Sequence, residues 1–366
     1  MNARLGPGLI TLLISLTPLQ QGLAEPYLAI QSGQKCMVCH TSPSGGGKRT
    51  PYGNLYTRTE LADHWIGKKG GGGDFWNGEI FEFLAVGGDL RGSWSKENAP
   101  GLDSQTDSEF DEFLAYFEVR LLPNYLTFYL DKRLRPDRPV EREKYLRLST
   151  KDGRFYVKGG DMFLPYGFRL QDDDAFIRQV PGINYNTPDT GWEAGMEHDD
   201  WSVQFAVTRG TAGAPDVDSG KQYSLRASYV QPTWRIGGSL NFNDAKVGDR
   251  QMQNVFAGLK MGRIAWLAEV DYIIDDGTPT GRRELWMSFI EANINVAKGH
   301  NAKLTFEYFD PDVDVSENQQ NRISAVWEYF PMQFLQVRAG YRHYDGIPQN
   351  PAQNREQFFL ELHVPF

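Results

Sequence analysis

The only two cysteines of this 366-residue chain, Cys36 and Cys39, stand three positions apart, and His40 follows directly. This C-x-x-C-H arrangement is the attachment motif of a c-type haem. The two thiols add across the vinyl groups of the porphyrin, and the adjacent imidazole reaches the iron as the proximal ligand. The motif therefore predicts one covalent haem c, held by Cys36, Cys39 and His40.

Other uses of this pair of cysteines are less well supported. A disulfide across so short a loop would add little stability, and a redox C-x-x-C usually accompanies a βαβ pattern, which is missing here. Zinc is a poor fit because three ligands are present, of which residues 39 and 40 are adjacent. The second axial ligand stays open. His64 is one candidate, Met162 is another, and an open iron site is a third.

The first residues of the chain have the features of an export signal. A short, weakly basic head precedes the mostly apolar stretch 5–19, and the small residues Gly22 and Ala24 follow. The apolar stretch is shorter than the ~20 residues that a membrane-spanning helix needs. We therefore predict a signal peptide over residues 1–24 and a mature chain that begins at Glu25.

From residue 79 to residue 366 the dominant pattern is an alternation of apolar and polar residues, seen clearly at 201–208, 223–229 and 335–342. Many of these runs are about ten residues long and end in Gly, Pro, Asn or Asp, as β-strands joined by turns do. We predict an all-β fold, a transmembrane up-and-down antiparallel barrel of about 16 strands. The irregular region 160–190 leaves the exact count open.

A soluble β-sandwich is the alternative to a membrane barrel. Aromatic residues such as Tyr223 and Tyr229 recur near strand ends on the apolar face, as in the aromatic girdles of membrane barrels. The other face carries charges that the core of a sandwich could not hold unpaired but that a wet lumen can hold. These charged residues are Glu118, Arg120, Arg147, Arg226, Glu307, Arg338, Arg342 and Glu361.

Residues 25–78 differ from the barrel region and form the predicted haem-binding segment. They are rich in Gly, Lys, Thr and Ser, with glycine clusters at 45–47 and 70–73 and a short helix expected within 51–64. A segment of this length cannot bury a haem well on its own. We expect it to fold back into the barrel as a lumen plug, with residues 70–73 as the hinge.

The composition excludes some classes of partner and indicates a location. The net charge is −9 and no basic run is present, so nucleic acid is not expected as a partner. The low mean hydropathy of −0.50 suits strands that face lipid on one side only. The chain ends in an amphipathic strand closing with Phe366, which resembles the sorting signal of bacterial outer-membrane proteins. We expect the barrel to lie among the lipids of the outer membrane.

The whole layout resembles that of the fused monohaem cytochrome–porins, on the basis of Cys36, Cys39, His40 and Phe366. Some members of that family are outer-membrane iron(II) oxidases. The resemblance implies an electron conduit in which a haem inside the barrel exchanges electrons with an external partner, such as Fe(II), and with a periplasmic c-type cytochrome. The chain is shorter than expected of those oxidases.

Two other functions fit the same sequence. The first is a porin or transporter with a haem-bearing periplasmic segment, in which the haem only docks a redox partner. The second is an insulating barrel that surrounds a partner multihaem cytochrome. No recognisable hydrolase, metalloprotease or phosphate-binding motif is present in the sequence.

Overall fold

The computed structural model describes residues 25–64, 76–136, 138–172, 174–183, 187–210, 219–246, 248–277 and 281–366. The expected signal peptide 1–24 and the glycine cluster 70–73 lie outside these residues. None of the described helices is long and apolar enough to cross a membrane.

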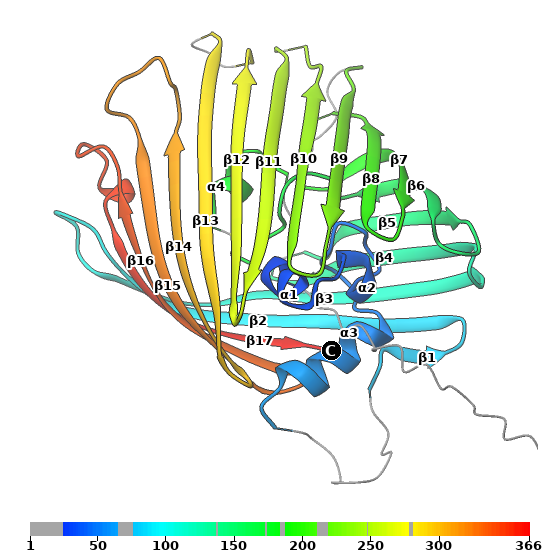
Figure 1. The fold of residues 1–366 in the computed structure, drawn as a ribbon. Coiled ribbons are helices and arrows are strands. Elements are labelled where there is room, and N and C mark those ends of the chain that lie inside the picture. The colour runs from blue at the N-terminus through cyan, green and yellow to red at the C-terminus, as the bar shows by residue number, and fades with distance from the viewer. Residues whose placement is uncertain are drawn as a thin grey trace, which may run out of the picture.

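The main body is a closed β-barrel (Figure 1). Strands β2–β17 pair in sequence order, each antiparallel to the next, and β17 pairs back onto β2, which closes a barrel of 16 strands in the described residues. The predicted fold class is therefore confirmed. The strands of the first half are β2 (Leu84–Asn98), β3 (Gln105–Leu122), β4 (Leu126–Arg135), β5 (Val140–Ser149), β6 (Phe155–Met162), β7 (Asp189–Glu197), β8 (Trp201–Thr208) and β9 (Gln222–Val230). Those of the second half are β10 (Trp234–Asn243), β11 (Arg250–Met261), β12 (Ile264–Asp275), β13 (Arg283–Ala297), β14 (His300–Asp310), β15 (Gln320–Met332), β16 (Leu335–Asp345) and β17 (Glu356–Pro365).

The connections between strands differ at the two ends of the barrel. At one end they are tight turns, such as 262–263, 298–299 and 333–334, whereas the other end carries longer connections such as 163–188 and 209–221. Outer-membrane barrels have short periplasmic turns and long extracellular loops. The short-turn end, where β2 begins and β17 finishes, is therefore the periplasmic end.

The outer surface of the barrel is apolar and the inner surface is largely polar. On β8, Phe205 is 45% exposed to the outside whereas the neighbouring Gln204 is buried in the interior. Of the eight predicted inward charges, five are buried inside and three are partly buried. The buried ones are Glu118, Arg226, Glu307, Arg338 and Arg342, and the partly buried ones are Arg120, Arg147 and Glu361. A closed barrel with an apolar outer belt is a transmembrane structure, and the expected location in the outer membrane agrees with this fold.

The last residue of the chain completes the closure of the barrel. The Phe366 N–H donates to Gly88 O at 2.9 Å, and the Gly88 N–H donates to Phe366 O at 2.8 Å. A Cβ atom at Gly88 would lie 2.5 Å from Cζ of Phe366, so the aromatic ring needs a glycine beneath it. The short strand β1 (Glu79–Phe81) pairs with the first residues of β2 just beyond this point.

Two segments fill part of the lumen. One is the N-terminal segment, with α1 (Pro26–Ser32), α2 (Cys36–Cys39), α3 (Pro51–Tyr56) and the π-helical turn η1 (Thr57–Leu61). Figure 1 shows α1 and α2 inside the ring of strands. The other is the β6–β7 connection, which contains the short helix α4 (Phe176–Gln179).

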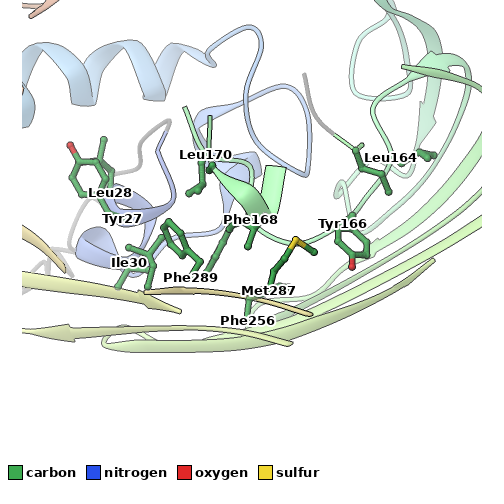
Figure 2. Close-up of a cluster of buried hydrophobic side chains, with 14 of the residues drawn as sticks. Tyr27, Leu28, Ile30, Leu164, Tyr166, Phe168, Leu170, Phe256, Met287 and Phe289 are labelled. Atoms are coloured by element: carbon green, nitrogen blue, oxygen red, sulfur yellow. The ribbon is translucent and has the colours of Figure 1, made fainter. Parts of the chain in front are cut away.

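These two segments pack on an apolar patch of the inner wall, which we did not expect. Tyr27, Leu28 and Ile30 of α1 meet side chains from the β6–β7 connection and from the wall in one buried cluster (Figure 2). The patch removes apolar surface from water and so stabilises the docked segments. Its inward-facing wall residues include Met252, Phe256, Leu267, Ile273, Leu285, Met287 and Phe289.

Candidate functional site

The C-x-x-C-H motif forms one helical turn inside the barrel. Cys36 and Cys39 are the first and last residues of α2, so their side chains lie near each other on one face of the turn. Both are free thiols. His40 ends the helix in an extended conformation, and its N–H donates to Cys36 O at 3.0 Å. The local fold therefore brings together the three residues that the sequence predicted to hold the haem.

A tight hairpin follows the motif and returns to it. His40 pairs with Arg49 in an antiparallel bridge, and the Thr50 N–H donates to Cys39 O at 2.8 Å. The turn depends on the glycine cluster 45–47, whose residues all have positive φ angles. At Gly47 a Cβ atom would lie 2.4 Å from the Tyr129 hydroxyl oxygen of the wall. This glycine cluster thus allows both the turn and its close approach to β4.

Polar contacts fix this hairpin to β3, β4 and β5. Thr41 Oγ1 donates to Glu118 at 2.8 Å, and Lys48 Nζ lies 3.3 Å from the same carboxylate. The Lys48 N–H donates to the Tyr129 hydroxyl at 3.0 Å, and Arg147 donates to Thr41 O at 2.8 Å.

Separate contacts fix α1 to the opposite part of the wall. Arg235 of β10 donates to the carbonyl oxygens of Ala29 and Gln34, at 2.7 Å each. Lys35 pairs with Glu197 of β7 at 2.8 Å. The N-terminal segment is therefore docked inside the lumen through specific contacts, as the expected plug requires.

His40 lies at the edge of a lumen cavity with about 960 Å³ of empty space. Its side chain is 3% exposed, and neither ring nitrogen has a hydrogen bond of normal geometry among the described residues, although the backbone of Gly46 and Gly47 lies near the ring. Burial, reinforced by the nearby Arg49 charge, lowers the pKa of His40 to about 4. The imidazole is therefore neutral at pH 7, which is the form that binds iron.

The two thiols are less accessible than the imidazole. Cys36 lines a smaller cavity of about 380 Å³, which shares Glu25, His40 and Arg169 with the larger one. Cys39 is fully buried, burial raises the pKa of its thiol, and it lines neither of these two cavities. A haem in the larger cavity would therefore reach Cys39 only if α2 moved.

The residues present fit a haem. The larger cavity opens beside the His40 imidazole and is lined by both apolar and cationic groups. It presents a neutral nitrogen donor and the apolar side chains of Leu28, Leu61 and Phe330. It also presents guanidinium groups, which suit the carboxylates of a porphyrin. These come from Arg49, Arg91, Arg142, Arg169 and Arg178.

The structure does not bring His64 or Met162 to this cavity. The His64 side chain is 74% exposed and lies 3.1 Å from Asp63 Oδ2. Met162 is buried with Tyr129 and Tyr145 in a separate cluster. Neither residue lines the cavity beside His40.

A different histidine, His363 of β17, lines the same cavity as His40. Its Nε2 lies 2.7 Å from Asp89 Oδ1, and its Nδ1 lies 2.9 Å from Gln336 Oε1. Sequence reasoning did not single it out as a site residue. The sequence feature that could have indicated it is the alternation of the last strand, which places His363 on the inward-facing side.

Comparison with known proteins supports the barrel fold and provides no match for the C-x-x-C-H motif. No protein-family model matches the chain, and no curated protein matches it in sequence. The structure is similar to OmpTdeltaL8, a loop L8 deletion mutant of an outer membrane protein of Vibrio cholerae, with a TM-score of 0.61 and 11% identity over 78% of this chain and 100% of that chain.

Two further similar structures are porins. An anion-selective porin from Comamonas acidovorans gives a TM-score of 0.60 and 9% identity, over 77% of this chain and 99% of that chain. Salmonella typhi OmpF, in a complex with daunomycin, gives a TM-score of 0.58 and 12% identity, over 77% of this chain and 97% of that chain. At such identities the likeness shows the fold alone, which is that of outer-membrane porins.

Proposed function

We propose that this porin-like barrel carries one haem c in its lumen, bound by Cys36 and Cys39 and ligated by His40, and that it moves electrons across the outer membrane. The observation that carries the proposal is the environment of His40. Its two ring nitrogens are buried at a lumen cavity, directly after a C-x-x-C pair, and neither has a hydrogen bond of normal geometry among the described residues. Buried polar atoms normally have partners, and an iron ligated by one ring nitrogen would supply one.

Transfer across the whole ~30 Å hydrocarbon layer needs a redox centre inside the lumen, because a haem at one membrane face would be too far from the other for rapid electron tunnelling. The cavity beside His40 lies inside the lumen on its periplasmic side, where the first residues of β2 and the last residues of β17 line it. A bound haem c supplies a one-electron couple whose potential depends on its ligands and burial. The cavity that would hold it lies between the hairpin 40–49 and strands that include β2, β3, β16 and β17. We propose a periplasmic c-type cytochrome as the partner at the short-turn end. Fe(II) is the external donor that the family resemblance suggests.

Electron transfer across a bilayer tests this function directly. The protein is placed in liposomes that contain a redox dye, and a membrane-impermeant reductant is added outside. The account predicts that the wild-type protein reduces the dye and that Cys36→Ala/Cys39→Ala, which keeps the barrel, does not. Equal rates for both proteins would contradict the proposal.

A second candidate function is the passage of small solutes, with the haem only docking a redox partner. Two observations favour it: the fold shared with porins, one of them described as anion-selective, and a second lumen cavity of about 1060 Å³ on the loop side. Liposome swelling in sugars or salts tests it. Rapid swelling would support a solute pore, and its absence would favour a closed conduit. A sheath for a multihaem partner predicts instead that such a cytochrome co-purifies with the barrel.

A further inference from the structure

Arg49 faces the same cavity as His40. The two residues form an antiparallel bridge, flanked by the hydrogen bond from the Thr41 N–H to Lys48 O at 3.0 Å. Residues directly opposite each other in an antiparallel pair present their side chains on the same face. Both side chains accordingly line the cavity of about 960 Å³. The hairpin therefore fixes a guanidinium beside the imidazole proposed to bind iron.

The charge of Arg49 has no close partner within the described part of the chain. Other lumen arginines lie near carboxylates, as Arg322 does near Glu307 at 2.6 Å. No carboxylate of the described residues lies within 4.0 Å of the Arg49 guanidinium, and the electrostatic influence of Asp89 reaches it only from farther away. Arg49 is partly buried and faces the cavity, where an anionic ligand would pair with its guanidinium.

The side chains that line the cavity carry more positive than negative charges. Five arginines line it, against the three side-chain carboxylates of Glu25, Asp89 and Glu112. The cavity therefore favours an anionic ligand.

We infer that Arg49 binds a carboxylate of the porphyrin and positions the ring against His40. This inference rests on the proposed function and adds which residue binds the carboxylate edge of the haem. Haem carries two propionate groups, which suit a cavity lined by five arginines. The planar guanidinium fork binds a carboxylate through two parallel hydrogen bonds, whereas the ammonium of a lysine acts as a point charge. Arg49 is thus a positioning residue that also sets the charge beside the haem.

The midpoint potential of the haem tests this role in the full-length protein. Ferric haem carries one more positive charge than ferrous haem, so a nearby cation stabilises the reduced form. Arg49→Gln should therefore lower the midpoint potential. The propionate would also lose its cation, so the pH-dependent step of the potential should move to higher pH. Arg49→Lys should shift the midpoint potential and its pH-dependent step less than Arg49→Gln does. Arg282→Gln, at an exposed position, should change neither quantity.

The possible outcomes separate this inference from the proposed function. A wild-type protein without covalent haem would contradict the function and the inference together. A haem-loaded Arg49→Gln protein with wild-type potential and pH dependence would contradict the inference alone. Heat-modifiable gel mobility establishes that each variant has a folded barrel. If Arg49→Gln does not fold, Arg49→Lys decides the question. A shift in the pH-dependent step of its midpoint potential supports the bidentate contact between Arg49 and a propionate, and an unshifted step overturns it.

Discussion

The hydroxyl of Tyr27, in the first helix of the N-terminal segment, donates a 2.9 Å hydrogen bond to Glu328 Oε2 on β15. The same carboxylate lies 2.8 Å from Lys303 Nζ and 3.4 Å from Arg338 Nε. Residues 301 positions apart are thereby joined inside the lumen. The N-terminal segment is held by the barrel rather than tethered beside it.

Replacing Tyr27 by phenylalanine should loosen the segment without unfolding the barrel. The lost hydrogen bond has a charged acceptor, so its removal should cost about 1.5–3 kcal/mol of local stability. Hydrogen exchange of the amides in α1 measures this change. Tyr52→Phe is the matched control, because the Tyr52 hydroxyl is buried without a hydrogen-bond partner among the described residues. Equal exchange rates in α1 for the two variants would show that the Tyr27 contact does not hold the segment.

A Gly47→Ala substitution should reduce haem loading. Gly47 has a φ of 64°, and a Cβ atom there would lie 2.4 Å from the Tyr129 hydroxyl oxygen. The hairpin 40–49 would have to move away from β4 and take His40 with it. Haem per polypeptide, measured from the reduced pyridine haemochrome spectrum, reports the effect. Gly101→Ala is the control, because Gly101 has a similar φ of 73° with nothing within 4 Å. A similar loss of haem in Gly47→Ala and Gly101→Ala would mean that backbone strain alone causes the effect.

Replacing the two candidate histidines should affect the haem differently. His64→Ala should leave the absorption spectrum unchanged, because that side chain is largely exposed and lies outside the cavity. His363→Ala should alter the spectrum, because His363 shares the cavity with His40 and is held there by Asp89 and Gln336. A spectral change in His64→Ala alone would restore His64 as the distal ligand.

The loop between β6 and β7 should open when Asp172 is neutralised. Asp172 pairs with Arg322 at 2.9 Å and with Arg342 at 2.8 Å. Asp172→Asn removes both ion pairs and leaves the buried charge of Arg322 less compensated, which should weaken docking by several kcal/mol. Single-channel conductance should then rise. Asp152→Asn, in an exposed turn, should not change it.

Mild acid should not reproduce the effect of Asp172→Asn. Burial opposes ionisation of Asp172, but Arg322 and Arg342 outweigh it and hold the pKa of this loop carboxylate well below its usual value. Ionised Asp172 therefore stabilises the docked loop fully at any pH above the pKa of the unfolded state. This stabilisation is lost only as pH falls through the lower pKa of the folded state. Conductance should therefore be constant between neutral pH and about pH 5, since the unfolded value is ~3.9. A rise in conductance within that range would contradict the assigned role of Asp172.

The sequence was sufficient to predict the barrel and the composition of the haem motif. Alternation such as that of residues 201–208 gives one apolar face whatever the partner strands are. The apolar inner patch could not be predicted in the same way, because on β11 both Phe256 and Val255 are apolar while only Phe256 faces inward. The docking of residues 26–32 against β11 and β12 depends on contacts between distant parts of the chain. His363 joins the cavity for the same reason, because the barrel must close before β17 lies beside β2.

The most direct test of the account is a haem stain of the outer-membrane fraction on a denaturing gel, run with and without heating. The account predicts one haem-positive band that migrates differently after heating, because a covalent haem and a folded barrel belong to the same chain. The band should lose its stain in Cys36→Ala/Cys39→Ala and keep its heat-dependent shift. A wild-type band that shifts with heating but carries no haem would contradict the central claim and leave a porin-like barrel.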